Sequence, residues 1–312
     1  MRLVLHRVLI AYPRAAELAE RIRSERPDLE LRERHPHHLT QEDLEWAGVL
    51  IGFRRPPLQG WGGLRWVHSI GAGVDGFLFR TGLPDHVLVT RSSEDFGPQI
   101  GEYCLARVLA VGQHLRYFAA EQEARRWTPR GADRVAGSRA VVLGTGMVGQ
   151  GIARALSATG IVVDGVSRSG APRPGFRAVM PAADFEAAMA GARWLILAAP
   201  LTEATWHFLD ATRLDLCGGA YLINVGRGGL VDEHALPEAL DRGRLSGAAL
   251  DVFETEPPPP ESPLWRHPAV AISPHISGIT SVEAAAAGFL ECLAAIERGE
   301  RPRWVAERER GY

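Results

Sequence analysis

The segment RAVVLGTGMVGQGIARALSATGIVVDGV, residues 139–166, constrains the fold of this chain more than any other stretch. An apolar run over 139–143 has the length of a buried strand, a glycine-rich turn follows it, and the pattern over 147–158 is typical of a helix. A second apolar run over 161–166 completes a strand–helix–strand unit. Because such units build parallel sheets with crossover helices, the segment predicts an α/β fold.

The turn inside this unit matches the pattern G-x-G-x-x-G with Gly144, Gly146 and Gly149. In a strand–turn–helix context these glycines allow a tight turn and a close approach of the backbone to a pyrophosphate. The helix that begins at Met147 and Val148 adds N–H donors and the positive end of its dipole. The sequence therefore predicts a dinucleotide-binding site.

The end of the second strand reads Ser167, Arg168, Ser169. A cofactor with a free 2′-hydroxyl is usually held at this point by Asp or Glu, and neither is present. An arginine suits a 2′-phosphate through charge-assisted hydrogen bonds, so we expect NADP(H) to be preferred, with NAD(H) possible. The alternative is that Arg168 is a solvated surface residue.

The remaining sequence repeats the alternation of strand-length apolar runs with amphipathic helices. At 312 residues the chain is longer than a single core usually supports, which predicts two Rossmann-like or flavodoxin-like domains with parallel sheets. We expect a substrate-binding domain from 1–97 with 283–312, and a cofactor-binding domain from 98–282. Expected strands are 2–11, 29–33, 48–53, 66–70, 87–90, 139–143, 161–166, 194–198, 220–225, 247–251 and 270–272. Expected helices are 14–25, one beginning near 40, 99–125, 147–158 and 281–298.

Composition narrows the classes of partner. A net charge of −2 gives no general attraction to nucleic acid or to an anionic membrane, and no apolar run is long enough to span a bilayer. Cys104, Cys217 and Cys292 are widely spaced, which fits neither a disulfide framework nor a metal motif. The histidine-rich text RERHPHH at 32–38 lacks suitable partners and is interpreted as a surface loop. We therefore expect no metal and a cytoplasmic location.

Three later segments end an apolar run with polar residues: NVGRG contains Arg227, FETEP contains Glu256 and SPHIS contains His275. Loops at the carboxyl ends of parallel strands converge on one crevice, so these side chains are expected to meet there. Taken singly, each has a simpler interpretation, because Arg227 and Glu256 could be solvated loop charges and His275 could cap a strand end.

Taken together, GAGVD, GTGMVG, NVGRGGLVDE, ALDVFETEP and SPHISG follow the order found in the D-isomer-specific, NAD(P)-dependent 2-hydroxyacid dehydrogenase family, which the whole chain resembles. The text at 218–222, the run PPPESPLWRHPAVAISPHIS and the final RGY are similar to the glyoxylate/hydroxypyruvate reductases within that family. The resemblance implies an active site in the interdomain cleft and a homodimer in which 99–125 belongs to the dimer-forming region.

The resemblance also implies a reaction, the reduction of a small 2-oxo acid to a D-2-hydroxy acid by hydride from nicotinamide C4. His275 can hold a proton near neutrality and is the expected general acid, and Glu256 is placed to orient its imidazole. Arg227 can bind the substrate carboxylate and polarise the carbonyl. The expected catalytic residues are Arg227, Glu256 and His275, and the expected substrate-binding residues are Ala72, Gly73, Val74, Arg227 and His275.

The resemblance extends the predicted cofactor site beyond the glycine-rich turn. The full expected set is Gly144, Gly146, Met147, Val148, Gly149, Ser167, Arg168, Ser169, Pro200, Thr205, Val225, Gly226, Arg227, Asp251, His275 and Gly278. Two other functions stay open at this point: a dehydrogenase-like protein that senses cofactor or binds partners, and a family member that acts on a different 2-hydroxy acid. Arg54, Arg55 and Arg91 follow strands of the first domain and could contact substrate or be surface charges.

Overall fold

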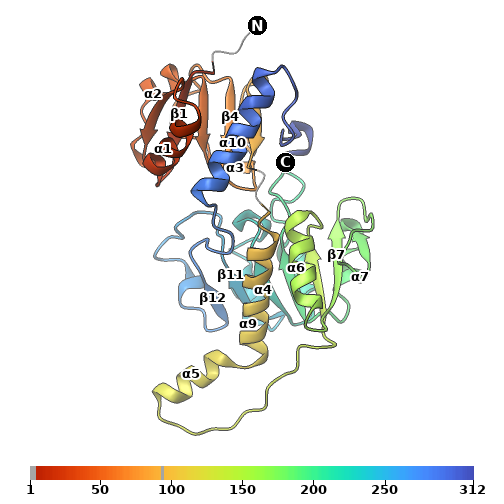
Figure 1. The fold of residues 1–312 in the computed structure, drawn as a ribbon. Helices are drawn as coiled ribbons and strands as arrows, with labels where there is room; N and C mark the ends of the chain where they lie inside the picture. Colours follow the sequence, from red (N-terminus) through yellow and green to blue (C-terminus); the bar gives the residue numbers. More distant parts are fainter. Residues whose placement is uncertain (1–4, 93–94) are drawn as a thin grey trace. The chain divides into compact units, whose positions relative to one another are not determined.

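The computed structural model describes residues 5–92 and 95–312 (Figure 1). The chain folds into two compact units: unit 1 comprises 1–94 with 279–312, and unit 2 comprises 95–278. Within the described ranges, no helix is long and apolar enough to cross a membrane. The assignment of unit 1 to substrate and unit 2 to cofactor stays a proposal.

Unit 1 is built on a parallel sheet of five strands in the order β2-β1-β3-β4-β5. The strands are β1 (Arg7–Ala11), β2 (Glu30–Arg34), β3 (Val49–Gly52), β4 (Trp66–Ser69) and β5 (Leu88–Arg91). The helices are α1 (Ala15–Glu25), α2 (Gln41–Trp46), α3 (Asp75–Leu78) and α10 (Val282–Glu297). Of the expected strand 2–11, residues 2–4 lie outside the described part.

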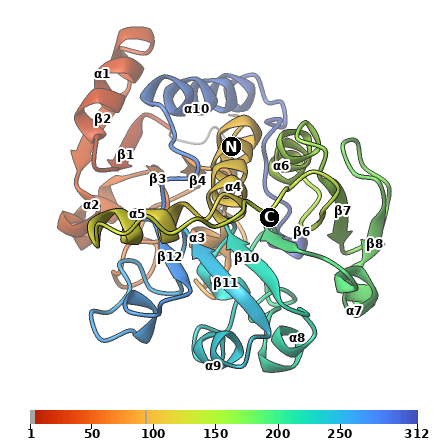
Figure 2. The same ribbon diagram turned by 90° about the horizontal axis from the view of Figure 1, so that it is seen from below.

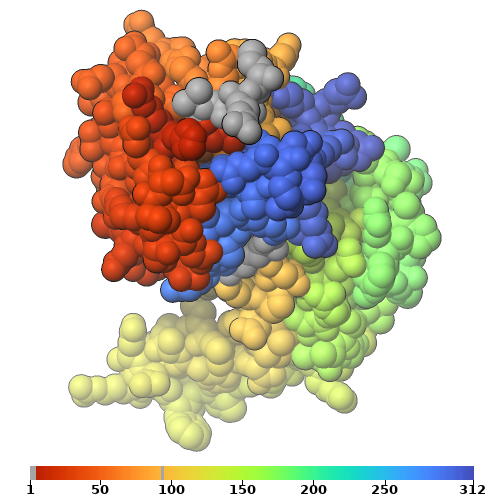
Figure 3. Space-filling model, turned by 45° about the horizontal axis from the view of Figure 1, so that its top comes forward, coloured from red at the N-terminus to blue at the C-terminus, as the bar shows by residue number. Residues whose placement is uncertain are grey.

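Both faces of this sheet are covered by helices, and successive residues of a strand point alternately to the two faces. Val8 and Ile10 of β1 join a core formed with α1 and α10, whereas Leu9 joins a second core that contains Phe77 of α3. The α10 helix returns from the far end of the chain to pack beside α1 (Figure 3). The last segment of the sequence therefore completes the core of the first one.

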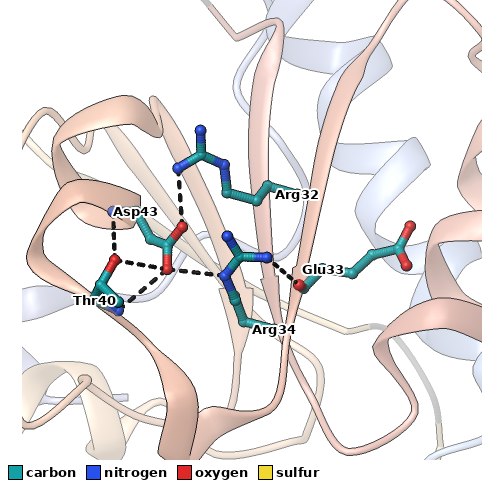
Figure 4. A network of polar contacts seen from close by, with 5 residues as sticks. All are labelled: Arg32, Glu33, Arg34, Thr40 and Asp43. Carbon is teal, nitrogen blue, oxygen red and sulfur yellow. Dashed lines mark hydrogen bonds and ion pairs between the residues drawn. The ribbon is translucent and has the colours of Figure 1, made fainter.

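A buried carboxylate attaches α2 to the edge strand β2 (Figure 4). Asp43 is 1% exposed and accepts hydrogen bonds from Arg32 at 2.9 Å and Arg34 at 3.0 Å, while Thr40 caps α2 reciprocally. Burial acts to raise the pKa of Asp43, but the bonds from the two arginines and Thr40 outweigh it and lower the pKa to about 2. Charged hydrogen bonds thus hold α2 to the edge strand, in addition to the packing of Leu31 of β2 against the core.

Unit 2 contains a parallel sheet of seven strands in the order β12-β11-β10-β9-β6-β7-β8. Its strands are β6 (Arg139–Leu143), β7 (Val162–Ser167), β8 (Val179–Pro181), β9 (Trp194–Leu197), β10 (Ala220–Asn224), β11 (Leu245–Leu250) and β12 (Val270–Ile272). Its helices are α4 (Gly97–Gly112), α5 (Leu115–Glu123), α6 (Met147–Ser157), α7 (Phe185–Met189), α8 (Ala211–Asp215) and α9 (Leu236–Asp241). The short α8 and α9 lie beside each other (Figure 2).

The strand order of unit 2 reverses at β6, which lies between β7 and β9. From β6 the chain continues to β7 and β8 on one side, whereas β9 to β12 extend from the other side of β6. Ligands of open α/β sheets bind outside the carboxyl ends of the strands at such a point. The glycine-rich turn at 144–149 directly follows β6. The α/β class and the parallel sheets predicted from the sequence are confirmed.

The single helix expected over 99–125 is wrong. The structure has α4 and α5 instead, because His114 adopts a left-handed conformation with φ 52° that interrupts helical hydrogen bonding. The arm, which we define as residues 113–138, leaves unit 2 through α5 and returns without further regular structure (Figure 1). The short elements β8, α7, α8 and α9 were also not predicted, since few residues carry their periodicity.

Candidate active site

The three glycines of the fingerprint serve different needs. Gly144 has φ 101°, and a Cβ there would lie 2.6 Å from the backbone of Ala198. A Cβ at Gly149 would lie 1.9 Å from the carbonyl oxygen of Gly144, so this glycine lets helix and strand pack closely. By contrast, a Cβ at Gly146 would meet nothing within 4 Å. The turn is closely packed at Gly144 and Gly149 and has free space at Gly146, which fits a bound pyrophosphate.

The α6 helix begins at Met147 with Gly146 as its N-cap, and no side chain caps its first turn. Amide groups at such an end favour an anion because of their N–H donors and the helix dipole. Val148 belongs to this first turn. The structure therefore places the fingerprint residues where a phosphate group of a dinucleotide can be held.

The residues after β7 form a compact turn. Ser167 Oγ accepts a hydrogen bond from Gly170 N at 3.1 Å, and Ser169 Oγ accepts one from Ala171 N at 3.3 Å. Arg168 is exposed, and no hydrogen bond or ion pair joins it to another residue of the described ranges. Its guanidinium is available to a phosphate.

Two further predicted cofactor residues lie in the turn after β9. Thr205 Oγ1 donates to the carbonyl oxygen of Pro200 at 2.7 Å and accepts from Thr202 N at 2.8 Å. Thr205 thereby closes the turn, and the exposed Pro200 lies at its start. The contact of this turn with a cofactor stays a prediction.

The loop that carries Arg227 is shaped by a residue that sequence reasoning did not assign. Asn224, 1% exposed, accepts from Gly226 N at 3.1 Å and donates from Nδ2 to the carbonyl oxygen of Arg227 at 2.9 Å. Val225, which lies between Asn224 and Gly226, is buried. A Cβ at Gly228 would lie 1.8 Å from the backbone of Phe253, so this loop presses on the segment that contains Glu256. The sequence feature that indicates this role of Asn224 is an amide side chain at the end of a buried apolar strand.

Glu256 and His275 form a direct pair. Glu256 Oε2 lies 2.8 Å from His275 Nδ1, while Glu256 Oε1 accepts from Phe253 N at 3.1 Å. Burial acts to raise the pKa of Glu256, but the bond with His275 and the charges of His275 and Arg227 outweigh it, so the net pKa is lowered. The structure thus brings Arg227, Glu256 and His275 together in unit 2.

Asp251 lies beneath the loop that carries His275. It is fully buried at the end of β11, and its carboxylate accepts hydrogen bonds from Ile276 N at 3.0 Å and Ser277 N at 2.8 Å. Its own carbonyl oxygen accepts from His275 N at 2.8 Å. Gly278 follows this loop and is half-buried. The predicted contacts of Asp251 and Gly278 with a cofactor stay predictions.

A second histidine–carboxylate pair was not predicted. His207 Nε2 lies 2.8 Å from Glu254 Oε1, and Glu254 N donates to Glu233 Oε1 at 2.7 Å. Burial, with smaller contributions from the charges of Glu254 and Glu256, raises the pKa of Glu233. The motif FETEP contains two glutamates, and each of them pairs with a different histidine.

The GAGVD turn belongs to unit 1 and follows β4. Ser69 Oγ donates to the carbonyl oxygen of Gly73 at 2.6 Å, which fixes the turn; Ala72 and Gly73 are half-buried and Val74 is buried. Ser69 pairs in register with Arg91 of β5. The backbone of this turn thus lies at the carboxyl edge of the unit 1 sheet.

The three arginines of unit 1 that the sequence left open differ in environment. Arg54 is exposed, whereas Arg55 donates to the carbonyl oxygen of Leu58 at 3.1 Å. Arg91 lies over the ring of Trp304 with its guanidinium carbon 4.9 Å from the centroid, and burial lowers its pKa. The packing of Arg55 and Arg91 gives both a structural role.

The fold and the site define an NAD(P)-dependent α/β oxidoreductase. Residues 105–277 match the family model "D-isomer specific 2-hydroxyacid dehydrogenase, NAD binding domain". The chain belongs to the D-isomer-specific 2-hydroxyacid dehydrogenase family, as the sequence motifs predicted.

The chain is also similar to individual proteins. The chain is 39% identical over 257 residues to an uncharacterized protein in the mprR 3′ region of Streptomyces coelicolor, covering 80% of this chain and 90% of that one. A Xanthobacter autotrophicus Py2 family member, solved with NADPH and MES, is similar with TM-score 0.86 and 30% identity, covering 99% and 100% of the two chains. An NADPH-dependent glyoxylate/hydroxypyruvate reductase from Sinorhizobium meliloti, solved with NADP and sulfate, gives TM-score 0.85 and 29% identity over 98% and 99%.

Proposed function

We propose that this protein reduces a small 2-oxo acid of the glyoxylate or hydroxypyruvate type to the D-2-hydroxy acid, with NADPH as the preferred reductant. The observation that carries the proposal is the 2.8 Å pair between His275 and Glu256, with the charge of Arg227 acting on the same carboxylate. The name of the Sinorhizobium meliloti relative supports this substrate class.

When bound, the cofactor supplies a hydride from nicotinamide C4. The open surface at Gly146 and the uncapped start of α6 would hold its pyrophosphate, and Arg168 would meet the 2′-phosphate. The relatives solved with NADPH or NADP support this preference. The other residues proposed to line the cofactor are Ser167, Ser169, Pro200, Thr205, Val225, Gly226, Asp251 and Gly278.

His275 delivers the proton that the carbonyl oxygen needs. Because Nδ1 faces Glu256, the carboxylate accepts the Nδ1 hydrogen and leaves Nε2 as the atom that gives up a proton to the substrate. In the reverse direction the same nitrogen takes the proton from the hydroxyl group. Glu256 orients the imidazole, because its carboxylate lies at hydrogen-bonding distance from Nδ1.

Arg227 is proposed to bind the substrate carboxylate and to stabilise the negative charge that develops on the carbonyl oxygen. Its loop is held from below by Asn224, which fixes the backbone on both sides of Gly226. We further propose that unit 1 is the substrate-binding unit and that the N–H groups around Ala72, Gly73 and Val74 contribute to carboxylate binding.

A panel of 2-oxo acids assayed with NADPH and with NADH tests this function. Glyoxylate or hydroxypyruvate should give the highest kcat/KM, and NADPH should be the better reductant. Turnover of a different 2-oxo acid would support the proposed reaction type but would change the proposed substrate. Binding of NADPH without turnover of any panel member would favour a cofactor-sensing protein and reject the enzymatic proposal.

We also propose a homodimer assembled through the arm. Leu115 is 57% exposed, Phe118 37% and Trp127 99%, so apolar side chains gather on a segment that leaves the body of unit 2. Exposed apolar groups of this kind mark association surfaces. A second copy of the chain is the expected partner, and a monomeric mass in solution would reject the proposal.

A further inference from the structure

One face of α4 supports the loop that carries His275. Residues Phe96, Ile100 and Tyr103 are spaced by four and three positions and so lie on one side of the helix. A Cβ at Gly278 would lie 3.1 Å from Ile100 and 3.3 Å from Phe96. Tyr103 OH lies 2.6 Å from Ser273 Oγ, at the other end of the loop. The helix therefore contacts the loop on both sides of His275.

The hydroxyl groups form a directed chain. Asp251 accepts N–H bonds on both carboxylate oxygens, and Ser273 Oγ donates its hydrogen to Oδ1 at 2.6 Å. Tyr103 must then be the donor to Ser273, because the serine hydrogen is in use. Ser273 and Asp251 are 4% and 0% exposed, so water does not readily replace either bond.

The same helix packs against the cofactor-fingerprint helix. A Cβ at Gly101 would lie 2.9 Å from the carbonyl oxygen of Gly151 in α6, and one at Gly97 would lie 3.1 Å from that of Met147. Figure 1 shows α4 and α6 side by side, and they pack together along much of their length. Because such closely packed helices have little freedom to move against each other, a displacement of one displaces the other. One rigid element thus supports the fingerprint helix and the His275 loop.

We propose that Tyr103 and Ser273 are positioning residues of the reaction: through Asp251 they hold the loop so that His275 stays aligned with the cofactor bound at α6. The inference rests on the proposed function. His275 has a left-handed backbone, with φ 52°, so its loop depends on surrounding contacts to keep this conformation. Small errors in the placement of a reacting group reduce the rate of chemistry more than they reduce binding.

Tyr103→Phe and Ser273→Ala test this directly. We expect kcat to fall about fivefold in the first and about tenfold or more in the second, with KM values for NADPH and the 2-oxo acid within about twofold. The primary deuterium isotope effect on kcat, measured with NADPH deuterated at C4, should rise because chemistry becomes slower than the other steps. Ser273→Thr keeps the hydroxyl and should restore most of the rate.

Tyr221→Phe is the matched control, since Tyr221 is a half-buried tyrosine of unit 2 on β10. It should leave kcat and the isotope effect unchanged. Wild-type kcat and isotope effect in both Tyr103→Phe and Ser273→Ala would overturn the inference, as would equal losses in Tyr221→Phe. These outcomes require an active wild-type enzyme, so they are distinct from failure of the proposed function, which shows as no turnover in the wild type.

Discussion

His275 Nδ1 lies 2.8 Å from Glu256 Oε2, and this contact joins the loop that follows β12 to the loop that follows β11. The two residues come from neighbouring strands of a parallel sheet, whose carboxyl ends meet at one edge. The glutamate also accepts a backbone N–H from Phe253, which holds its carboxylate towards the imidazole. The pair leaves Nε2 of His275 as the nitrogen that we propose donates the proton.

Replacing His275 by glutamine should remove the proton donor while keeping a polar side chain. We expect kcat to fall by about a hundredfold or more, and the Kd for NADPH to change little. His207→Gln is the matched control, because His207 also pairs with a carboxylate of unit 2 at a distance of 2.8 Å. Near-normal turnover in His275→Gln would reject its role as general acid.

Replacing Arg227 by lysine should keep the charge but lose the planar two-pronged donor. We expect kcat/KM for the 2-oxo acid to fall by about a hundredfold, because one ammonium cannot match both the carboxylate and the carbonyl oxygen. Steady-state kinetics measures this. Arg266→Lys, at an exposed position of the same unit, is the control. An unchanged kcat/KM in Arg227→Lys would assign substrate binding elsewhere.

Replacing Arg168 by alanine should weaken NADPH selectively. Charge-assisted bonds to a phosphate predict a rise in KM for NADPH of about tenfold or more, with KM for NADH nearly constant. The comparison needs both cofactors in one assay series. Arg154→Ala, on α6 in the same unit, controls for the loss of a positive charge. A parallel rise for NADPH and NADH would argue against recognition of the 2′-phosphate.

Replacing Trp127 by aspartate should dissociate the proposed homodimer. The side chain is 99% exposed in the single chain, so the substitution removes no packing within it and adds charge where apolar burial is needed. Sedimentation velocity should report the mass of a monomer. Trp265→Asp, at another exposed tryptophan, should keep the wild-type mass. If both variants sediment as the wild type does, the arm is not the interface.

Replacing Asp43 by asparagine should destabilise unit 1 in a pH-dependent way. The folded pKa of about 2 lies below the ordinary aspartate value of 3.8, so its contribution is present above about pH 4 and is lost as pH falls toward 2. We expect a loss of about 2 kcal/mol in the free energy of unfolding near neutral pH, and a smaller difference in acid. Denaturant unfolding at several pH values measures it.

Asp28→Asn is the control for that measurement. Asp28 also pairs with an arginine and has its pKa lowered to about 2, chiefly by the hydrogen bond from Arg26, but its side chain is 49% exposed. Solvent screening should make its effect much smaller than that of Asp43. Equal losses in the two variants would show that burial does not strengthen the Asp43 network.

The local parts of the fold followed directly from the sequence. The fingerprint could be placed because its glycines, strand and helix lie within one short segment, and short-range sterics alone require that order. Thr40 and the start of α2 could be placed for the same reason, since a capping residue acts on its own first turn. The family resemblance identified Arg227, Glu256 and His275, because their motifs are contiguous.

The sequence by itself thus determined the α/β class, the dinucleotide turn and the identity of the three candidate catalytic residues. The tertiary structure decided that the other glutamate of FETEP, Glu254, pairs with His207, where the helix over 99–125 breaks, and that Tyr103 reaches Ser273. The physical reason is distance along the chain. These contacts join residues that are far apart in sequence or depend on a backbone conformation at His114, and no local pattern records either.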